Sequence, residues 1–165
     1  MTNRYLIFSI AALLVLFSGC AGVSAPPSAE SAAVQAQPEP VKSENKAVIA
    51  LLDMAHTDNE AGRRDAADAS LERALRIEPR NAWLWLELAQ LRLAEGQYAQ
   101  AITLARKSIS FAGHDQRLLA LDWQVIGNAR VAQGDSMGGE QAFKLATEHA
   151  QSAKAEADHG FDLFK

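Results

Sequence analysis

The stretch AEGQYAQAITLARKSI, residues 94–109, has a counterpart on either side of it in the chain. The counterparts are EAGRRDAADASLERAL at residues 60–75 and AQGDSMGGEQAFKLAT at residues 132–147. Their glycines align at Gly62, Gly96 and Gly134, at intervals of 34 and 38 residues. Small residues fall in register on both sides of the glycine: Ala55, Ala89 and Gly127 before it, Ala67, Ala101 and Gly139 after it. A period of this length is typical of repeat architectures, in which each unit packs against the next.

Apolar residues recur at helical spacing from Lys46 onward, and few turn residues interrupt them. The aligned glycine permits the left-handed backbone that ends the first helix of each pair. The small positions let paired helices approach closely, and larger repeated side chains fill the space between units. Pro79 closes the first unit, and Asn81 is placed to cap the helix that follows. The pattern predicts successive pairs of antiparallel helices.

This combination resembles the tetratricopeptide repeat, a helix–turn–helix unit of 34 residues. The resemblance implies an all-α fold, a short α-solenoid of three repeats over residues 46–151. The expected units are residues 47–80, 81–114 and 115–151. Three departures from the family pattern are expected to weaken the packing of the third unit: four extra residues near Ala112 to Leu118, Gly113 in place of a proline, and Gly138-Gly139 at the start of the last helix.

Residues 152–165 form the C-terminal tail. We expect the tail to extend the last helix to about Asp158. Phe161, Leu163 and Phe164 are then expected to fold back and cap the last repeat, because an exposed final helix is a liability in a repeat protein. The alternative is that this amphipathic end is itself a docking motif.

The N-terminus, residues 1–19, is predicted to be a signal peptide. Arg4 precedes an apolar run from Tyr5 to Phe17, which is shorter than the roughly 20 residues of a membrane-spanning helix. Cys20, the only cysteine in the chain, follows this segment. Residues 16–20, LFSGC, resemble the lipobox of bacterial lipoproteins, with phenylalanine where the family prefers leucine. The resemblance implies that Cys20 is acylated and begins the mature protein; the alternative is an ordinary signal peptide with an incidental cysteine.

Ala21 follows the cysteine, in place of the aspartate that commonly retains such lipoproteins at the inner membrane. The resemblance therefore implies anchoring at the periplasmic face of the outer membrane. Residues 20–45 are rich in Ala, Ser, Pro, Glu and Gln, with too few large apolar side chains to form a core, and are predicted to be a disordered linker. This linker spans at most ~85 Å, so the domain it carries stays near its membrane.

Residues with catalytic potential are present, but their context does not favour catalysis. Residues 134–138, GDSMG, match the G-x-S-x-G elbow of serine hydrolases, yet that elbow follows a strand and a helix is predicted here. Ser136 therefore matches by coincidence, and Asp158 and His159 are adjacent to one another near the terminus. The four histidines lack metal-ligand spacing, and the net charge of −4 argues against nucleic acid as a partner. The sequence predicts a protein that is not an enzyme and binds no metal, no small-molecule substrate and no cofactor beyond the lipid on Cys20.

In tetratricopeptide proteins the first helix of each unit lines a concave groove that binds a protein segment. The resemblance places these residues in the groove: Ile49, Leu52, His56, Asn59, Trp83, Leu86, Gln90, Leu93, Leu121, Gln124, Asn128 and Val131. Trp83 and Trp85 are about 200° apart on a helix, so only one of them faces this groove. Trp85 occupies the packing position of the repeat, which leaves Trp83 either as a binding anchor or packed on the neighbouring first helix. The groove is expected to be apolar with amide edges and without a lysine cluster.

The lipobox, the Pro/Ala/Gln linker and the small repeat domain together resemble the outer-membrane activators of peptidoglycan synthases (class A penicillin-binding proteins) of pseudomonad-like bacteria. The resemblance implies an anchored periplasmic scaffold that binds a bifunctional peptidoglycan synthase. An assembly factor for a pilus secretin or for the outer-membrane protein insertion complex is the alternative within the same class. A serine hydrolase acting through Ser136, or a structural tether to the cell wall, is the alternative from other classes.

Overall fold

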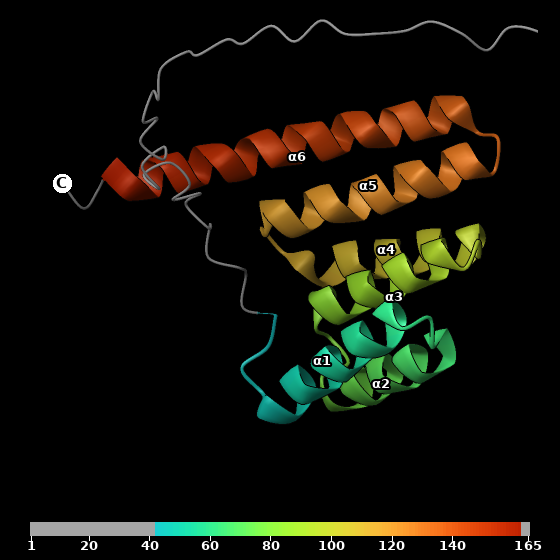
Figure 1. Ribbon diagram of the computed structural model, residues 1–165. Helices are drawn as coiled ribbons and strands as arrows, with labels where there is room; N and C mark the ends of the chain where they lie inside the picture. The colour runs from blue at the N-terminus through green and yellow to red at the C-terminus, as the bar shows by residue number, and fades with distance from the viewer. Residues whose placement is uncertain (1–41, 163–165) are drawn as a thin grey trace, which may run out of the picture. The chain divides into compact units, whose positions relative to one another are not determined.

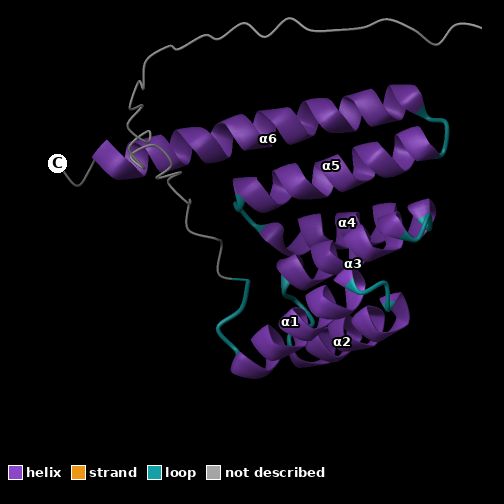
Figure 2. Cartoon of the chain, viewed as in Figure 1, coloured by secondary structure: helices purple, strands orange, loops and turns teal. Residues whose placement is uncertain are grey.

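The computed structural model describes residues 42–162, with the side chains of residues 42–158. The expected signal peptide, Cys20 and the linker up to residue 41 lie outside the described residues, as do Leu163 and Phe164. Within the described range every regular element is a helix, which confirms the predicted all-α fold (Figure 2). The helices are α1 (Lys46–Glu60), α2 (Arg64–Ile77), α3 (Ala82–Ala94), α4 (Tyr98–Ala112), α5 (Gln116–Ala132) and α6 (Ser136–Asp162).

The helices form three antiparallel pairs, α1–α2, α3–α4 and α5–α6, which stack in chain order (Figure 1). Contacts of α3 with α2, and of α5 with α3 and α4, join each pair to the next. This arrangement confirms the predicted short solenoid of three helix–turn–helix units. No helix within residues 42–162 combines the length and the apolar character needed to cross a membrane.

The repeated glycines end the first helix of each pair, as the sequence predicts. Gly62, Gly96 and Gly134 have φ angles of 75°, 76° and 87°, in the left-handed region that side chains with a Cβ rarely adopt. The residue after each glycine donates its backbone N–H to the carbonyl five positions earlier, at 2.8 to 2.9 Å. These bonds satisfy carbonyls at the helix end and reverse the chain, which makes the two helices of a pair antiparallel.

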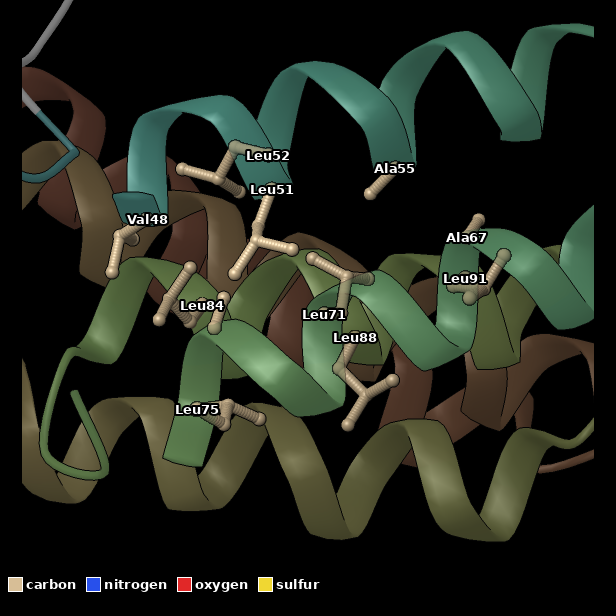
Figure 3. Packing of buried hydrophobic residues seen from close by; sticks show 11 residues of the cluster. Val48, Leu51, Leu52, Ala55, Ala67, Leu71, Leu75, Leu84, Leu88 and Leu91 are labelled. Atoms are coloured by element: carbon tan, nitrogen blue, oxygen red, sulfur yellow. The ribbon is translucent and has the colours of Figure 1, made fainter. Parts of the chain in front are cut away.

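The repeated small residues lie where paired helices touch. Ala55, Ala67, Ala89 and Ala101 are at most 2% exposed. Larger apolar side chains surround them in two clusters, the first formed by α1, α2 and α3 (Figure 3) and the second by α3 to α6. Leu84 of α3 is fully buried in the first cluster. Since α3 contributes to both clusters, the core is continuous along the stack.

The third unit accommodates the four extra residues differently from the prediction. They are expected in the connection near Ala112 to Leu118, but that connection is short, because α4 ends at Ala112 and α5 begins at Gln116. Instead α5 has 17 residues where α3 has 13. Four residues are about one helical turn of 3.6 residues, so the added turn keeps the apolar face of α5 toward its neighbours.

The two glycines at the start of α6 support the packing of the third unit, contrary to the prediction that they weaken it. A Cβ on Gly138 would lie 2.1 Å from Oδ2 of Asp135, whose Oδ1 accepts the backbone N–H of Gly138 at 2.9 Å. Arg130 of α5 donates to the Gly138 carbonyl at 3.0 Å. A Cβ on Gly139 would lie 3.2 Å from the Gly127 carbonyl oxygen of α5. The missing side chain at Gly139 therefore lets α5 and α6 approach, and Gly138 leaves room for the Asp135 and Arg130 side chains.

The end of α6 also differs from the prediction. The helix continues to Asp162, four residues beyond the expected end at Asp158, so Phe161 is part of the helix backbone. With 27 residues, α6 is ten residues longer than α5 and runs beyond it (Figure 1). Whether the last residues cap the stack or dock to a partner stays a prediction.

Candidate functional site

The candidate groove is lined by α1, α3 and α5, the first helices of the three pairs. Ten of the twelve predicted groove residues retain exposed surface: Ile49, His56, Asn59, Trp83, Gln90, Leu93, Leu121, Gln124, Asn128 and Val131. Leu52 and Leu86 do not, since they are 5% and 1% exposed. Both are core residues, because the neighbouring pair covers part of the helix face that the repeat pattern assigns to the groove. Their side chains pack beneath the exposed groove residues and are not accessible to a partner.

The two tryptophans of α3 lie on different sides of the helix, as predicted. Trp85 packs against the first cluster and donates its indole N–H to the Pro79 carbonyl at 3.0 Å. Trp83 packs against the second cluster and remains partly exposed. The ammonium of Lys42 lies 5.9 Å from the centre of the Trp83 ring. Trp83 thus packs between units and still presents ring surface at the groove.

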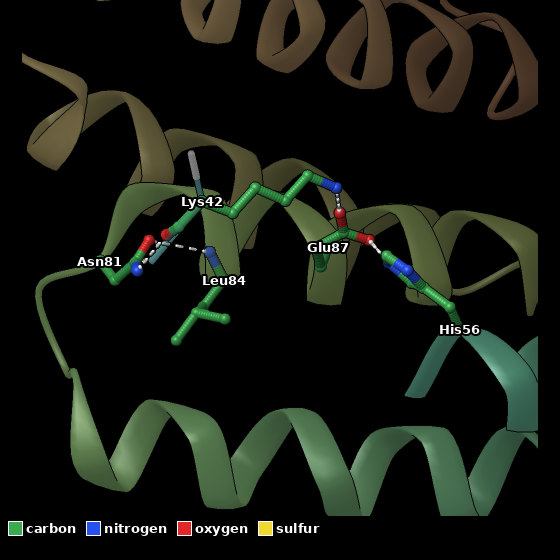
Figure 4. Close-up of polar contacts among 5 residues, drawn as sticks. All are labelled: Lys42, His56, Asn81, Leu84 and Glu87. Atoms are coloured by element: carbon green, nitrogen blue, oxygen red, sulfur yellow. Dashed lines mark hydrogen bonds and ion pairs between the residues drawn. The ribbon is translucent and has the colours of Figure 1, made fainter. Parts of the chain in front are cut away.

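Glu87 is a groove residue that is absent from the predicted set. It lies one turn after Trp83, and its side chain is 12% exposed. The Lys42 ammonium pairs with its Oε1, and Nε2 of His56 lies 3.1 Å from its Oε2 (Figure 4). Helical spacing identifies it, because positions 83, 87 and 90 share one face of α3. The Glu87 carboxylate is therefore held between Lys42 and His56.

The residues just before α1 contact α3 and are ordered. Asn81 donates its side-chain N–H to the Lys42 carbonyl at 2.7 Å, and the Ser43 hydroxyl donates to Glu78 at 2.7 Å. Asn45 caps α1 by accepting the backbone N–H of Ala47 at 2.9 Å. Residues 42–45, which the sequence analysis assigns to the linker, therefore contact the repeat domain. Composition alone does not reveal these contacts, because the residues that make them lie about 40 positions away in the chain.

A small hollow lies beside Glu87, between α1, α2 and α3. Its volume is about 70 Å³, with an apolar floor that includes Leu71 and Leu91. Asn59 and Gln90 contribute amide groups to its rim. Pockets for small-molecule ligands are usually about 300–1,000 Å³, so this hollow has room for the end of a side chain and not for a metabolite.

The G-x-S-x-G match is part of a helix cap. Asp135 is the residue that caps α6, and Ser136 is the exposed first residue of that helix, directly after the turn from α5. The strand that a nucleophile elbow requires is absent from residues 42–162. Across the same residues no group of three or more His, Cys, Asp or Glu side chains is placed to hold a metal ion.

Comparison with known proteins agrees with this geometry. A family model described as tetratricopeptide repeat matches residues 45–121. The chain is 41% identical to the globular C-terminal domain of P. aeruginosa LpoP, with a TM-score of 0.62, over 64% of this chain and 99% of that domain. The chain belongs to the tetratricopeptide repeat family. The resemblance read from the sequence is confirmed.

A second structure shares the tetratricopeptide fold at lower identity. The N-terminal domain of stress-induced protein-1 (STI-1) from C. elegans is 20% identical, with a TM-score of 0.57, over 66% of this chain and 93% of that domain. At this identity the similarity shows the fold alone. Among curated proteins none matches the chain. The tetratricopeptide domain is a protein-interaction scaffold, and its groove is the candidate site for a protein partner.

Proposed function

We propose that this protein is a non-catalytic scaffold, anchored by a lipid on Cys20 to the periplasmic face of the outer membrane, that binds and activates a bifunctional peptidoglycan synthase. The observation that carries the proposal is the 41% identity to the globular LpoP domain of a pseudomonad, along essentially its whole length. This similarity supports the resemblance to the peptidoglycan synthase activators of such bacteria. The exposed side chains on α1, α3 and α5 provide the surface for the synthase.

Activation requires that the groove bind the active conformation of the synthase more tightly than the inactive one. A scaffold shifts a conformational equilibrium only by its differential affinity for the two states, so a tenfold activation requires about 1.4 kcal/mol of preference. Partly buried aromatic side chains typically contribute most to such affinity. Trp83 is the aromatic residue of α3 that presents its ring at the groove, so it is the expected anchor.

Full-length protein is expected to stimulate glycan-strand synthesis by a purified class A penicillin-binding protein, and groove substitutions are expected to reduce this effect. Trp83→Ala should weaken binding by at least about tenfold, since truncation of an interface anchor costs about 2 kcal/mol or more. Gln124→Arg places a bulky charge on an exposed groove position and should also weaken binding, without disturbing the core. The polymerisation rate is measured directly, and the binding affinity is measured by light scattering or fluorescence anisotropy.

Ile77→Ala is the matched control, because Ile77 is an apolar side chain of α2 with 45% exposure and lies outside the predicted groove. It should leave binding and stimulation unchanged. An absence of both binding and stimulation by the wild-type protein would contradict the proposal. In that event, loss of twitching or of outer-membrane proteins in a deletion strain would favour the envelope-assembly role.

Cys20→Ser is expected to release the protein from the outer membrane. Wild-type protein should remain in the outer-membrane fraction after a high-salt wash, because several acyl chains exceed the two signals that stable anchoring needs. The serine variant should appear in the soluble periplasmic fraction and lack an acyl mass. Ser24→Ala, in the adjoining linker, should behave as wild type. Salt extraction of an unmodified wild-type protein would contradict the anchoring.

A further inference from the structure

The groove holds an ion pair made by the chain with itself. Lys42, just before α1, pairs with Glu87 of α3, and the two side chains are 27% and 12% exposed. Glu87 lies between the Trp83 ring, one turn before it on α3, and the hollow that its own side chain helps to line. A carboxylate next to an aromatic face is the combination that binds a basic side chain, through a charge-assisted hydrogen bond and a cation–π contact.

The surroundings of Glu87 are suited to a basic side chain presented by an extended peptide. Asn81 binds the main-chain carbonyl of Lys42, so α3 recognises both the backbone and the side chain of this segment (Figure 4). Asn45, at the end of the segment, has an extended backbone with φ −77° and ψ 113°. His56 holds the second carboxylate oxygen from α1. Lys42 itself shows the ligand that fits: its ammonium pairs with Oε1 of Glu87 and lies 5.9 Å from the centre of the Trp83 ring.

From these contacts we infer that Glu87 and Trp83 form a recognition site for a lysine or arginine side chain on an extended segment of the protein partner, and that Lys42 fills this site in the free chain. Partner binding then exchanges Lys42 for the partner's basic side chain. Because Lys42 is tethered beside the site, it competes at an effective concentration in the millimolar range. Residues 42–45 are thus an internal competitor, which a partner displaces only when further groove contacts favour it. The inference rests on the proposed function in that the partner uses this groove, although the site's chemistry does not depend on which partner it is.

The test uses isotope-labelled full-length protein in detergent and a peptide of the chain's own residues 38–45, PEPVKSEN. Binding is followed by NMR, a method that detects millimolar affinities, through the signals of the Trp83 indole N–H and the Glu87 amide. The Lys42→Ala variant should bind the peptide about tenfold more tightly than wild type, because the tethered competitor is gone. Glu87→Gln in the Lys42→Ala background should abolish this gain, since it removes the charge and keeps the side chain's shape.

Two controls separate recognition of the charge from a general effect. The same peptide with an acetylated lysine should not bind the Lys42→Ala variant. Glu72→Gln, a substitution of an exposed glutamate on α2, should leave peptide binding unchanged in that background. Equal binding by wild type and Lys42→Ala, or binding that survives Glu87→Gln or lysine acetylation, would overturn the inference. Peptide binding as expected together with no effect on any synthase would instead overturn only the proposed function.

Discussion

Gly139→Leu is expected to lower the free energy of unfolding of the full chain by about 3 kcal/mol. Adding side-chain atoms to a tightly packed contact costs about 1–3 kcal/mol or more, because backbone on one side of the contact cannot move aside. A Cβ at this position would lie 2.5 Å from Cγ2 of Val131 and 3.2 Å from the Gly127 carbonyl oxygen. The Val131 side chain is 47% exposed and can rotate away, but the carbonyl belongs to the backbone of α5. A leucine therefore forces the last pair of helices apart.

Helix propensity alone predicts the opposite result. In an isolated helix, leucine is more favourable than glycine by up to about 1 kcal/mol. The sign of the change in the free energy of unfolding therefore shows whether packing or helix propensity dominates at this position. Thermal and urea unfolding, followed by circular dichroism at 222 nm, measure the free energy of unfolding directly.

Glu140→Leu is the control for this substitution, because Glu140 is the next residue of α6 and is exposed. It should change the stability by no more than about 0.5 kcal/mol, as surface substitutions usually do. Gly139→Ala should fall between the two leucine variants. A Gly139→Leu protein as stable as wild type would show that α5 and α6 do not approach as closely as described.

Asp122→Asn is expected to stabilise the protein above pH 7 and to leave it nearly unchanged near pH 4. Asp122 of α5 is fully buried beside Ser108 of α4, whose hydroxyl also contacts the carbonyl of Ala82 in α3. Burial raises the pKa of its carboxyl group from 3.8 to about 7, an effect that the Ser108 hydrogen bond partly offsets and nearby Asp115 reinforces. Oδ1 of Asp122 has no hydrogen-bond partner within the described residues.

The hydrogen bonds around Asp122 fit its neutral form. The Ser108 hydroxyl oxygen lies 2.7 Å from Asp122 Oδ2 and 2.9 Å from the Ala82 carbonyl oxygen. A hydroxyl has one proton and donates to only one of these acceptors. A protonated Asp122 can donate to Ser108, which then donates to Ala82. The asparagine amide can make the same donation without a charge.

The direction of the pH dependence follows from the raised pKa. Between about pH 4 and pH 7 the folded protein keeps a proton that the unfolded chain has released, so stability falls as the pH rises through this range and levels off above it. At 1.36 kcal/mol per pK unit, the loss attributable to Asp122 is at most roughly 4 kcal/mol. The asparagine variant should lose this slope, so the difference from wild type grows with pH.

The measurement is chemical unfolding of the two proteins from pH 4 to pH 8. Asp115→Asn is the matched control: Asp115 caps α5 by accepting the Leu118 N–H at 2.9 Å, and asparagine caps a helix about equally well. This control should keep most of the wild-type pH dependence. Parallel curves for wild type and Asp122→Asn would show that Asp122 is ionised at no cost in the folded protein.

Most of the fold was predictable from the sequence, because a tetratricopeptide unit is defined by local features that recur. The glycine at each turn, the small residue on either side of it and the helical spacing of apolar residues all act within about 34 residues. The candidate site was less predictable. Helical spacing placed Trp83 and Trp85 on different sides of α3. The family resemblance assigned twelve residues to the groove, but Leu52 and Leu86 among them are buried. A period identifies which face of a helix a residue lies on, and not how deeply the neighbouring helices cover it.

The repeat pattern was therefore enough to predict the helix pairs and their turns. The stacked fold was needed to show that Lys42 pairs with Glu87, 45 residues away, and that Asp122 is buried beside Ser108. The fold was also needed to show that Gly139 lets α5 and α6 pack closely, whereas Gly138-Gly139 reads as a weak helix start in the sequence. The reason is physical: propensity and periodicity describe each helix separately, while burial, ion pairing and steric fit depend on which side chains the stacking brings together.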